Sequence, residues 1–257
     1  MNILLTNDDG IYAQGLWALH QHLSRSHEVF VIAPDRERTA VGHGITLHTP
    51  LRANKISITP DAEGIAVNGT PADCIKLGVI EMLTQRPDLV ISGINPGANV
   101  GINLNYSGTV SAAREAALFG LPAIAVSMEG NNRDLLSDIA RFIGQLAETV
   151  FEKGLPLGTF LNVNIPGIRM EDVSGIRVSR QSVSLLSEYF EKRNDPRNRT
   201  YYWQGCDSRH IYESPDTDGA ALGNKYISIT PVKCDMTDYS IMEDLKRWEI
   251  VLPGIKN

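Results

Sequence analysis

Short apolar segments that alternate with helical patterns constrain the fold of this chain more than any other feature. Most of these segments are apolar throughout, as in strands that are buried on both faces. Alternation of such strands with helices is typical of an α/β fold with a doubly wound, mostly parallel sheet. The predicted strands cover residues 3–6, 29–33, 89–92, 123–127 and 160–165, and the predicted helices cover residues 16–24, 71–85, 109–119 and 134–151.

The character of the sequence changes after about residue 182. A polar, charged stretch at residues 188–199 precedes a strand-like aromatic cluster at 201–203, and an amphipathic segment at 239–248 closes the chain. We therefore divide the chain into a core, residues 1–182, and a C-terminal hairpin arm with a closing segment, residues 183–257. The arm is expected to contribute to subunit contacts without forming an independent domain.

Composition excludes several classes of protein. The net charge of −6 and the pI near 5.5 argue against binding to a nucleic-acid polymer, which requires a basic face. Cys74, Cys206 and Cys234 are too few and too widely spaced for a zinc ribbon or a disulfide framework. No apolar run reaches the roughly 20 residues of a membrane span, and the N-terminus lacks the basic start of a signal peptide. The expected location is the cytoplasm, without membrane contact.

The first predicted strand ends at Asp8, Asp9 and Gly10. Ligands of open α/β sheets bind outside the carboxyl ends of the strands, which is where these acids lie. Two neighbouring carboxylates repel each other and are costly to bury unpaired, and a bound cation removes both problems. Taken alone, a solvated turn or a helix N-cap at Asp9 explains the same residues about equally well.

The loop after the second predicted strand carries a hydroxyl and several charges. Thr39 offers a neutral oxygen ligand for a hard cation. Arg36 and Arg38 could steer an anionic substrate. By charge alone, the simpler interpretation is that these arginines pair with Asp35 and Glu37.

A glycine-rich loop follows the strand predicted at residues 89–92. Asn95 can present an amide oxygen to a cation, and Gly93, Gly97 and Gly101 permit close approach of the backbone to a ligand. The spacing fits neither the dinucleotide-binding motif nor the P-loop. An ordinary glycine-rich turn is the alternative interpretation.

Ser107, Gly108 and Thr109 open the helix predicted at residues 109–119. Helix N-termini bind phosphate through free N–H groups, although routine N-capping by Ser107 or Thr109 is common enough to be the preferred interpretation of this motif taken alone. If this helix start lies close to the three loops, a cation site lies beside a site that binds an anion. That combination suits metal-assisted hydrolysis of a phosphoester.

These segments resemble the motifs of the SurE family, the stationary-phase survival nucleotidases. The resemblance spans essentially the whole chain, is strong to about Gln181 and is looser through the arm. The matching motifs are Thr6-Asn-Asp-Asp-Gly10, Ala33-Pro-Asp35, Asn68-Gly-Thr-Pro-Ala-Asp-Cys74, Ser92-Gly-Ile-Asn95, Tyr106-Ser-Gly-Thr109, Asn162-Val-Asn-Ile-Pro166 and Tyr226-Ile-Ser-Ile-Thr-Pro231.

The resemblance implies a Rossmann-like core and a 5′-nucleotidase that acts on nucleoside monophosphates with one divalent cation, Mg²⁺ or Mn²⁺. Some relatives also act on 3′-nucleotides and polyphosphate, and the arm implies a homodimer or homotetramer. The implied metal ligands are Asp8, Asp9, Asn95 and the hydroxyl at position 39. The family usually carries serine there, and the additional methyl group of Thr39 could crowd the ligands or alter the metal preference.

We expect Asp8 to be the catalytic residue that orients or deprotonates the attacking water. Asn95, Ser107, Gly108 and Thr109 are expected to bind the phosphate. A phosphoaspartyl mechanism ranks second, because the Asp-x-Asp spacing of such phosphatases is missing after the first strand. A non-catalytic nucleotide sensor and an arm-mediated scaffold are alternatives from other classes of protein.

Overall fold

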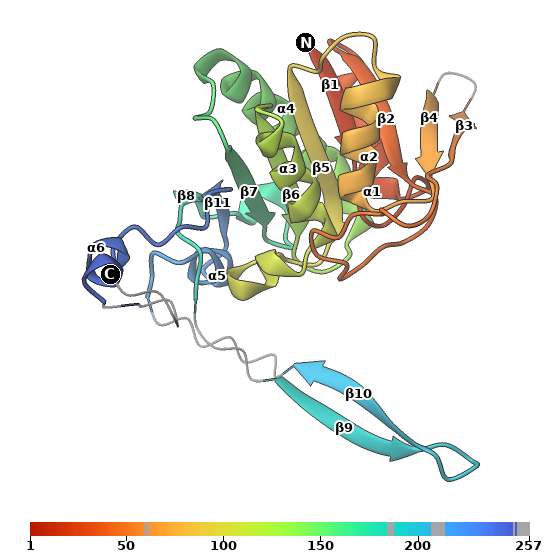
Figure 1. The fold of residues 1–257 in the computed structure, drawn as a ribbon. Helices are drawn as coiled ribbons and strands as arrows, with labels where there is room; N and C mark the ends of the chain where they lie inside the picture. Colours follow the sequence, from red (N-terminus) through yellow and green to blue (C-terminus); the bar gives the residue numbers. More distant parts are fainter. Residues whose placement is uncertain (60–61, 184–187, 207–213, 249, 251–257) are drawn as a thin grey trace.

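A nine-stranded sheet forms the centre of the computed structural model, which describes residues 1–59, 62–183, 188–206, 214–248 and 250 (Figure 1). The strand order is β3-β4-β2-β1-β5-β6-β7-β11-β8. All neighbouring strands pair in parallel except β3 with β4 and β7 with β11. The strands are β1 Asn2–Thr6, β2 Glu28–Pro34, β3 Ala53–Thr59, β4 Ala62–Val67, β5 Leu89–Pro96, β6 Ala123–Met128, β7 Thr159–Ile165, β8 Gly175–Val178 and β11 Tyr226–Lys233.

Helices cover both faces of this sheet, which confirms the predicted doubly wound α/β fold. The hydrophobic cluster on one face contains residues of α1 and α4, and the cluster on the other face contains residues of α2 and α3. Strand β1 supplies Ile3 and Leu5 to the first cluster and Leu4 to the second, because successive side chains point to opposite faces. The helices are α1 Gln14–Leu23, α2 Pro71–Leu77, α3 Gly108–Leu118 and α4 Leu136–Lys153.

The region between the second and third predicted strands differs from the sequence-based expectation. Strands β3 and β4 form an antiparallel hairpin that no prediction covered. Burial along β3 alternates only weakly, with no fully buried residue, so its sequence carries little of the apolar signal of a core strand. The helix predicted at residues 71–85 is also shorter, because α2 ends at Leu77 and a π-helical turn, Gly78–Met82, follows.

Residues after position 182 contribute to two separate structures. Strands β9 (Glu188–Asn194) and β10 (Thr200–Cys206) form an antiparallel hairpin of their own, which Figure 1 shows away from the main sheet. Strand β11 instead pairs with β7 and β8, and helix α5 (Asp218–Gly223) packs against β11. The main sheet therefore uses residues from both sides of position 182.

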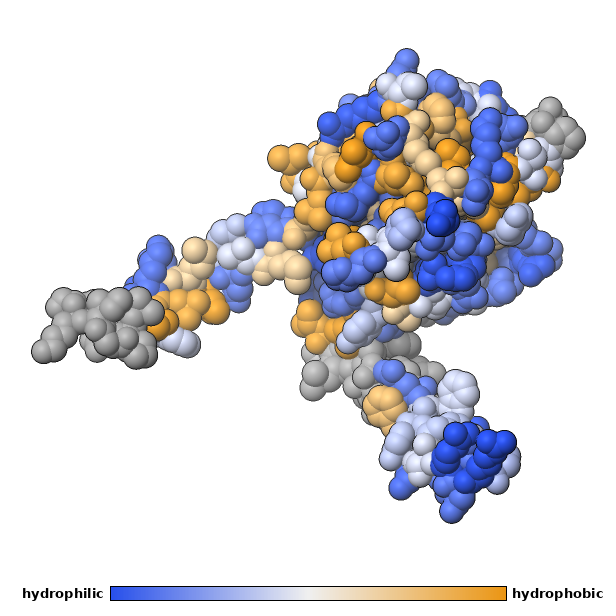
Figure 2. Space-filling view, turned by 45° about the vertical axis from the view of Figure 1, so that its right-hand side comes forward, coloured by the Kyte–Doolittle hydropathy of each residue, from blue (hydrophilic) through white to orange (hydrophobic). Residues whose placement is uncertain are grey.

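Helix α6 (Met242–Arg247) follows β11 near the end of the described chain. In Figure 2, two segments project from the rounded body, and they correspond to the β9–β10 hairpin and the α6 region of Figure 1. Among the helices that the structure describes, none has the length and apolar character needed to cross a bilayer.

Candidate functional site

The candidate site lies at the carboxyl ends of β1, β2 and β5. Within the sheet, β2 is the neighbour of β1 in one direction, whereas β5 and then β6 follow β1 in the opposite direction. Such a reversal of strand order opens a crevice in which α/β proteins bind ligands. A cavity of about 350 Å³ occupies this position. Of the predicted site residues, five line it together: Asp8, Asp9, Thr39, Asn95 and Ser107.

Asp8 is held rigidly in this crevice. Its side chain is almost fully buried, and the Thr109 hydroxyl donates a hydrogen bond to its carboxylate. The backbone N–H of Arg38 donates to the Asp8 carbonyl at 2.7 Å, which ties the first loop to the second. Burial raises the pKa of the Asp8 carboxyl, whereas hydrogen bonds from Thr109 and from the backbone at the start of α3 act in the opposite direction.

Asp9 carries the least satisfied carboxylate of the site. Among the described residues, its Oδ2 atom is buried and has no hydrogen-bond partner. Burial, together with the negative charges of Asp8 and Glu37, raises the pKa of the Asp9 carboxyl to about 7. A buried carboxylate in this position requires either a proton or a cation to compensate its charge.

Thr39 and Asn95 supply neutral oxygen atoms to the same cavity. The Thr39 hydroxyl donates to Oε1 of Glu37 at 2.5 Å. The Asn95 Nδ2 group donates to the Gly97 carbonyl at 2.7 Å, which leaves the amide oxygen of Asn95 as the atom suited to a cation. Asn95 lies within β5 rather than in the predicted loop, because β5 continues to Pro96, four residues beyond the predicted end at Ser92.

The start of α3 packs directly against Asp8. Ser107 lines the cavity, but its Oγ atom also caps α3 by accepting the N–H of Val110. Thr109 is fully buried, and its hydroxyl is bonded to Asp8. A Cβ atom on Gly108 would lie only 2.6 Å from the Cβ of Asp8. Gly108 and Thr109 therefore support Asp8 directly, a role that the sequence did not indicate.

Asn99 is a cavity residue that the sequence analysis did not select. Its backbone N–H donates to Oδ1 of Asn164 at 2.7 Å, and its carbonyl accepts hydrogen bonds from the side chains of Asn162 and Asn164. Its side chain donates to Oγ of Ser127 at 2.8 Å. Asn162 and Asn164 lie two residues apart on one strand, so their side chains share one face of it. This spacing is the sequence feature from which their role could have been predicted.

Glu37, Asn103 and Tyr106 also line the cavity, and sequence reasoning assigned no site role to them. Tyr106 exposes 54 % of its surface, although its backbone is fixed. Its N–H donates to the Asn103 carbonyl at 3.0 Å, and its carbonyl accepts the N–H of Gly42 at 2.9 Å. The site thus offers an aromatic ring at its edge, on a backbone tied to the loop that contains Thr39.

The donor atoms of this site fit a hard divalent cation. They comprise two carboxylates, an amide oxygen and a hydroxyl, which are the ligand types that Mg²⁺, Mn²⁺ and Ca²⁺ prefer. Within the described part of the chain, no three His, Cys, Asp or Glu side chains form a metal-binding group. A cation here would accordingly depend on the neutral oxygens of Asn95 and Thr39 in addition to Asp8 and Asp9. The unpartnered Oδ2 atom of Asp9 is the observation that favours such a cation.

We predict that the metal-free protein loses stability as the pH rises from about 4 to about 7. The Asp9 carboxyl has a pKa of about 7 in the folded chain and 3.8 in the absence of the fold. The folded state therefore holds a proton that the unfolded state releases in this range, so its free energy of unfolding falls with pH. Urea denaturation of EDTA-treated protein measures this slope, and Asp9→Asn should flatten it. An unchanged slope in that variant would contradict the prediction.

Comparisons with known proteins find similar proteins over nearly the whole chain. The family model described as "Survival protein SurE" matches residues 3–188. The chain is 57% identical to a protein named 5′-nucleotidase SurE from Desulfatibacillum aliphaticivorans, over 98% of this chain and 100% of that protein. A protein of the same name from Carboxydothermus hydrogenoformans is 47% identical over 99% of this chain and 98% of its own length.

The crystal structure of the SurE protein from Aquifex aeolicus superimposes with a TM-score of 0.85 at 39% sequence identity, covering 97% of this chain and 100% of that one. Sequence and fold thus agree over nearly the whole length of the chain. The crevice of paired acids described above lies within the segment that the family model matches. The chain belongs to the SurE family.

Proposed function

We propose that this protein is a divalent-metal-dependent 5′-nucleotidase that releases phosphate from nucleoside 5′-monophosphates. The names of its full-length relatives support the activity. The single observation that carries the metal dependence is the buried, unpartnered carboxylate oxygen of Asp9 beside Asp8. The proposal extends to 3′-nucleotides and polyphosphate, because each of these reactions also transfers a terminal phosphoryl group to water.

Asp8, Asp9, Asn95 and Thr39 are the residues that would hold the cation. When bound, a divalent cation would compensate the charge of the two carboxylates and polarise a phosphoryl oxygen. The hydrogen bond between Thr39 and Glu37 leaves the Thr39 oxygen able to act as an acceptor or ligand. The amide oxygen of Asn95 suits the cation, and the second N–H of its Nδ2 group, beyond the one bonded to Gly97, is available to donate to a phosphoryl oxygen.

The remaining chemistry falls to Asp8 and its neighbours. Asp8 would orient or deprotonate the attacking water, and the hydrogen bond from Thr109 keeps its carboxylate in one orientation. Ser107 lines the cavity at the start of α3, where the positive end of the helix favours anions. Negative charge that develops on the phosphoryl oxygens would be stabilised there.

Tyr106 supports a nucleoside as the leaving group. Its exposed ring lines the cavity that contains Asp8 and Asp9, and all nucleobases can stack on such rings. The cavity of about 350 Å³ is also within the range of small-molecule sites. The substrate would accordingly place its phosphate near Asp8 and Asp9 and its base near Tyr106.

The proposed activity is tested by phosphate release from a panel of 5′- and 3′-nucleoside monophosphates with Mg²⁺, Mn²⁺ or EDTA. We expect release from 5′-monophosphates that is lost in EDTA and restored by either cation. Nucleoside triphosphates serve as the comparison and should release less phosphate. Release that persists in EDTA would contradict the cation site, and the absence of release with every cation would favour a nucleotide sensor.

We further propose that the β9–β10 hairpin mediates homodimer or homotetramer contacts. Tyr189, Phe190, Tyr202 and Trp203 are all exposed on this hairpin, each by more than half of its surface. Exposed aromatic clusters of this kind are typical of protein interfaces. Sedimentation analysis of the full chain and of a variant with serine at these positions tests the assignment.

A further inference from the structure

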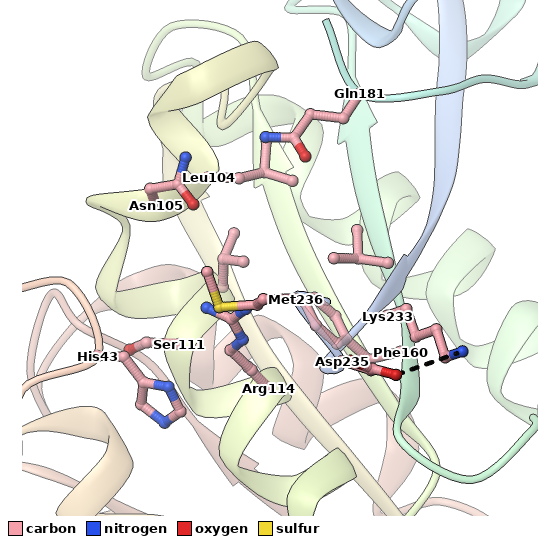
Figure 3. Close-up of a pocket in the computed structure, with 12 residues that line it drawn as sticks. His43, Leu104, Asn105, Ser111, Arg114, Phe160, Gln181, Lys233, Asp235 and Met236 are labelled. Atoms are coloured by element: carbon pink, nitrogen blue, oxygen red, sulfur yellow. Dashed lines mark ion pairs between the residues drawn. The ribbon is translucent and has the colours of Figure 1, made fainter. Parts of the chain in front are cut away.

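A second cavity lies next to the candidate site and shares with it the short 3₁₀ turn Gly101–Asn105 (Figure 3). Its volume is about 230 Å³, and it lies between α3, β7 and the end of β11. None of Asp8, Asp9, Thr39 and Asn95 lines it. Its apolar wall consists of Leu104, Val110, Phe160, Val232 and Met236.

The polar wall of this cavity carries more basic than acidic groups. Among the described residues, His43, Arg114 and Lys233 line it with one carboxylate, that of Asp235, and the other polar side chains are the neutral Asn105, Ser111 and Gln181. Asp235 already has several partners, because it accepts hydrogen bonds from the Tyr239 hydroxyl and the Thr237 N–H. The ion pair between Lys233 and Asp235 is long, at 3.9 Å. An excess of basic groups in one cavity is unusual for a chain with a net charge of −6.

Arg114 is a cation of this cavity for which the described residues provide no counterion. In Figure 3 its side chain rises from α3 toward Met236. No carboxylate of the described residues forms an ion pair with its guanidinium group. The acid that follows it in sequence, Glu115, is bonded instead to His43 at 2.7 Å and to Lys76 at 3.1 Å.

The Cys234 thiol lies beside Arg114, and it donates a hydrogen bond to the Arg114 carbonyl at 3.6 Å. Burial raises the pKa of this thiol, and Arg114 opposes that rise. A neutral thiol is a weak acceptor and leaves most of the five N–H donors of an arginine available. A half-buried arginine with this surplus of donors is suited to a carboxylate or phosphate group, which it can bind through two parallel hydrogen bonds.

We propose that this cavity binds a small organic anion, with its apolar body against Leu104, Phe160 and Val232 and its carboxylate or phosphate group on Arg114. The apolar wall and the basic wall face the same space, so one ligand can contact both. The site is separate from the paired acids. Binding is therefore independent of any cation at Asp8 and Asp9, and independent of the proposed nucleotidase activity.

Calorimetric titration of the full-length, EDTA-treated protein tests this site. The probes are phenylphosphonate and benzoate, which combine an apolar ring with a phosphonate or carboxylate group, and methylphosphonate, which lacks the ring. Loss of a charge-assisted hydrogen bond should weaken the binding of the better ring-bearing probe to Arg114→Gln by about tenfold or more. Methylphosphonate should bind more weakly than phenylphosphonate, because the apolar wall then contributes little.

Arg141→Gln is the matched control, since it removes the same charge from an exposed position on α4 that pairs with Asp138. It should bind all three probes as the unaltered protein does. Arg114→Lys retains the charge without the paired donors and is expected to show intermediate affinity. The probe that binds more tightly identifies the head group as phosphate-like or carboxylate-like. Equal affinity of the unaltered protein and Arg114→Gln, or equal weakening by Arg141→Gln, would overturn the proposal.

Discussion

Asp8→Asn is expected to lower kcat for nucleoside monophosphate hydrolysis by about 10³-fold, the range associated with loss of a general base. The substitution keeps the size of the side chain and the acceptor for the Thr109 hydroxyl. It removes the negative charge, and it places an amide NH₂ among the backbone N–H groups at the start of α3. Initial rates at saturating substrate and cation measure the effect.

The control for this variant is Asp138→Asn, which changes the same residue type on the exposed face of α4. Its kcat should match that of the unaltered protein. Near-normal turnover by Asp8→Asn would remove Asp8 from the mechanism. Retention of a phosphoryl-fluoride mimic on the Asp8 carboxylate would instead support the phosphoaspartyl alternative, in which Asp8 attacks phosphorus directly.

The sequence predicts the position of the site because local pattern identifies the buried strands and the polar residues that follow them, although β5 extends four residues past its predicted end. Ile3, Leu4 and Leu5 form a run that is apolar on both faces, so the acids that follow it must lie at the edge of a buried sheet. Parallel strands that neighbour each other end at the same edge, and this geometry brings Asn95 to Asp8 and Asp9. The convergence of the loops follows from these facts without knowledge of any contact.

The supporting contacts of the site could not be predicted in the same way. Thr109 donates to an acid 101 residues earlier in the chain, and Asn164 binds a backbone N–H 65 residues away. Such bonds depend on how closely helix and sheet approach, which no local pattern specifies. The hairpin of β3 and β4 was missed for a related reason, because β3 lies at the edge of the sheet and carries many polar side chains.

Gly108→Ala should lower kcat by about 10²-fold, because small displacements of catalytic groups have effects of this size. The alanine Cβ would lie 2.6 Å from the Cβ of Asp8 and 2.8 Å from its Oδ2 atom, both shorter than real contacts. Position 108 opens α3, and its φ angle is not in the positive range that requires glycine. Helix propensity alone would favour alanine there, so a decrease in kcat would be caused by the steric contact with Asp8.

Overpacking at this contact should also reduce the free energy of unfolding by about 1–3 kcal/mol, as measured by urea denaturation. Gly144→Ala is the matched control, because Gly144 lies within α4 and its new Cβ would come too close only to the ring of His22, at 2.8 Å from Nε2, with Leu23 Cδ2 at an ordinary 3.7 Å among its nearest neighbours. The ring of a partly exposed histidine can rotate away, whereas Asp8 is enclosed by Thr109 and the start of α3. If both variants retained full activity, the close packing of α3 on Asp8 would not be what positions the carboxylate.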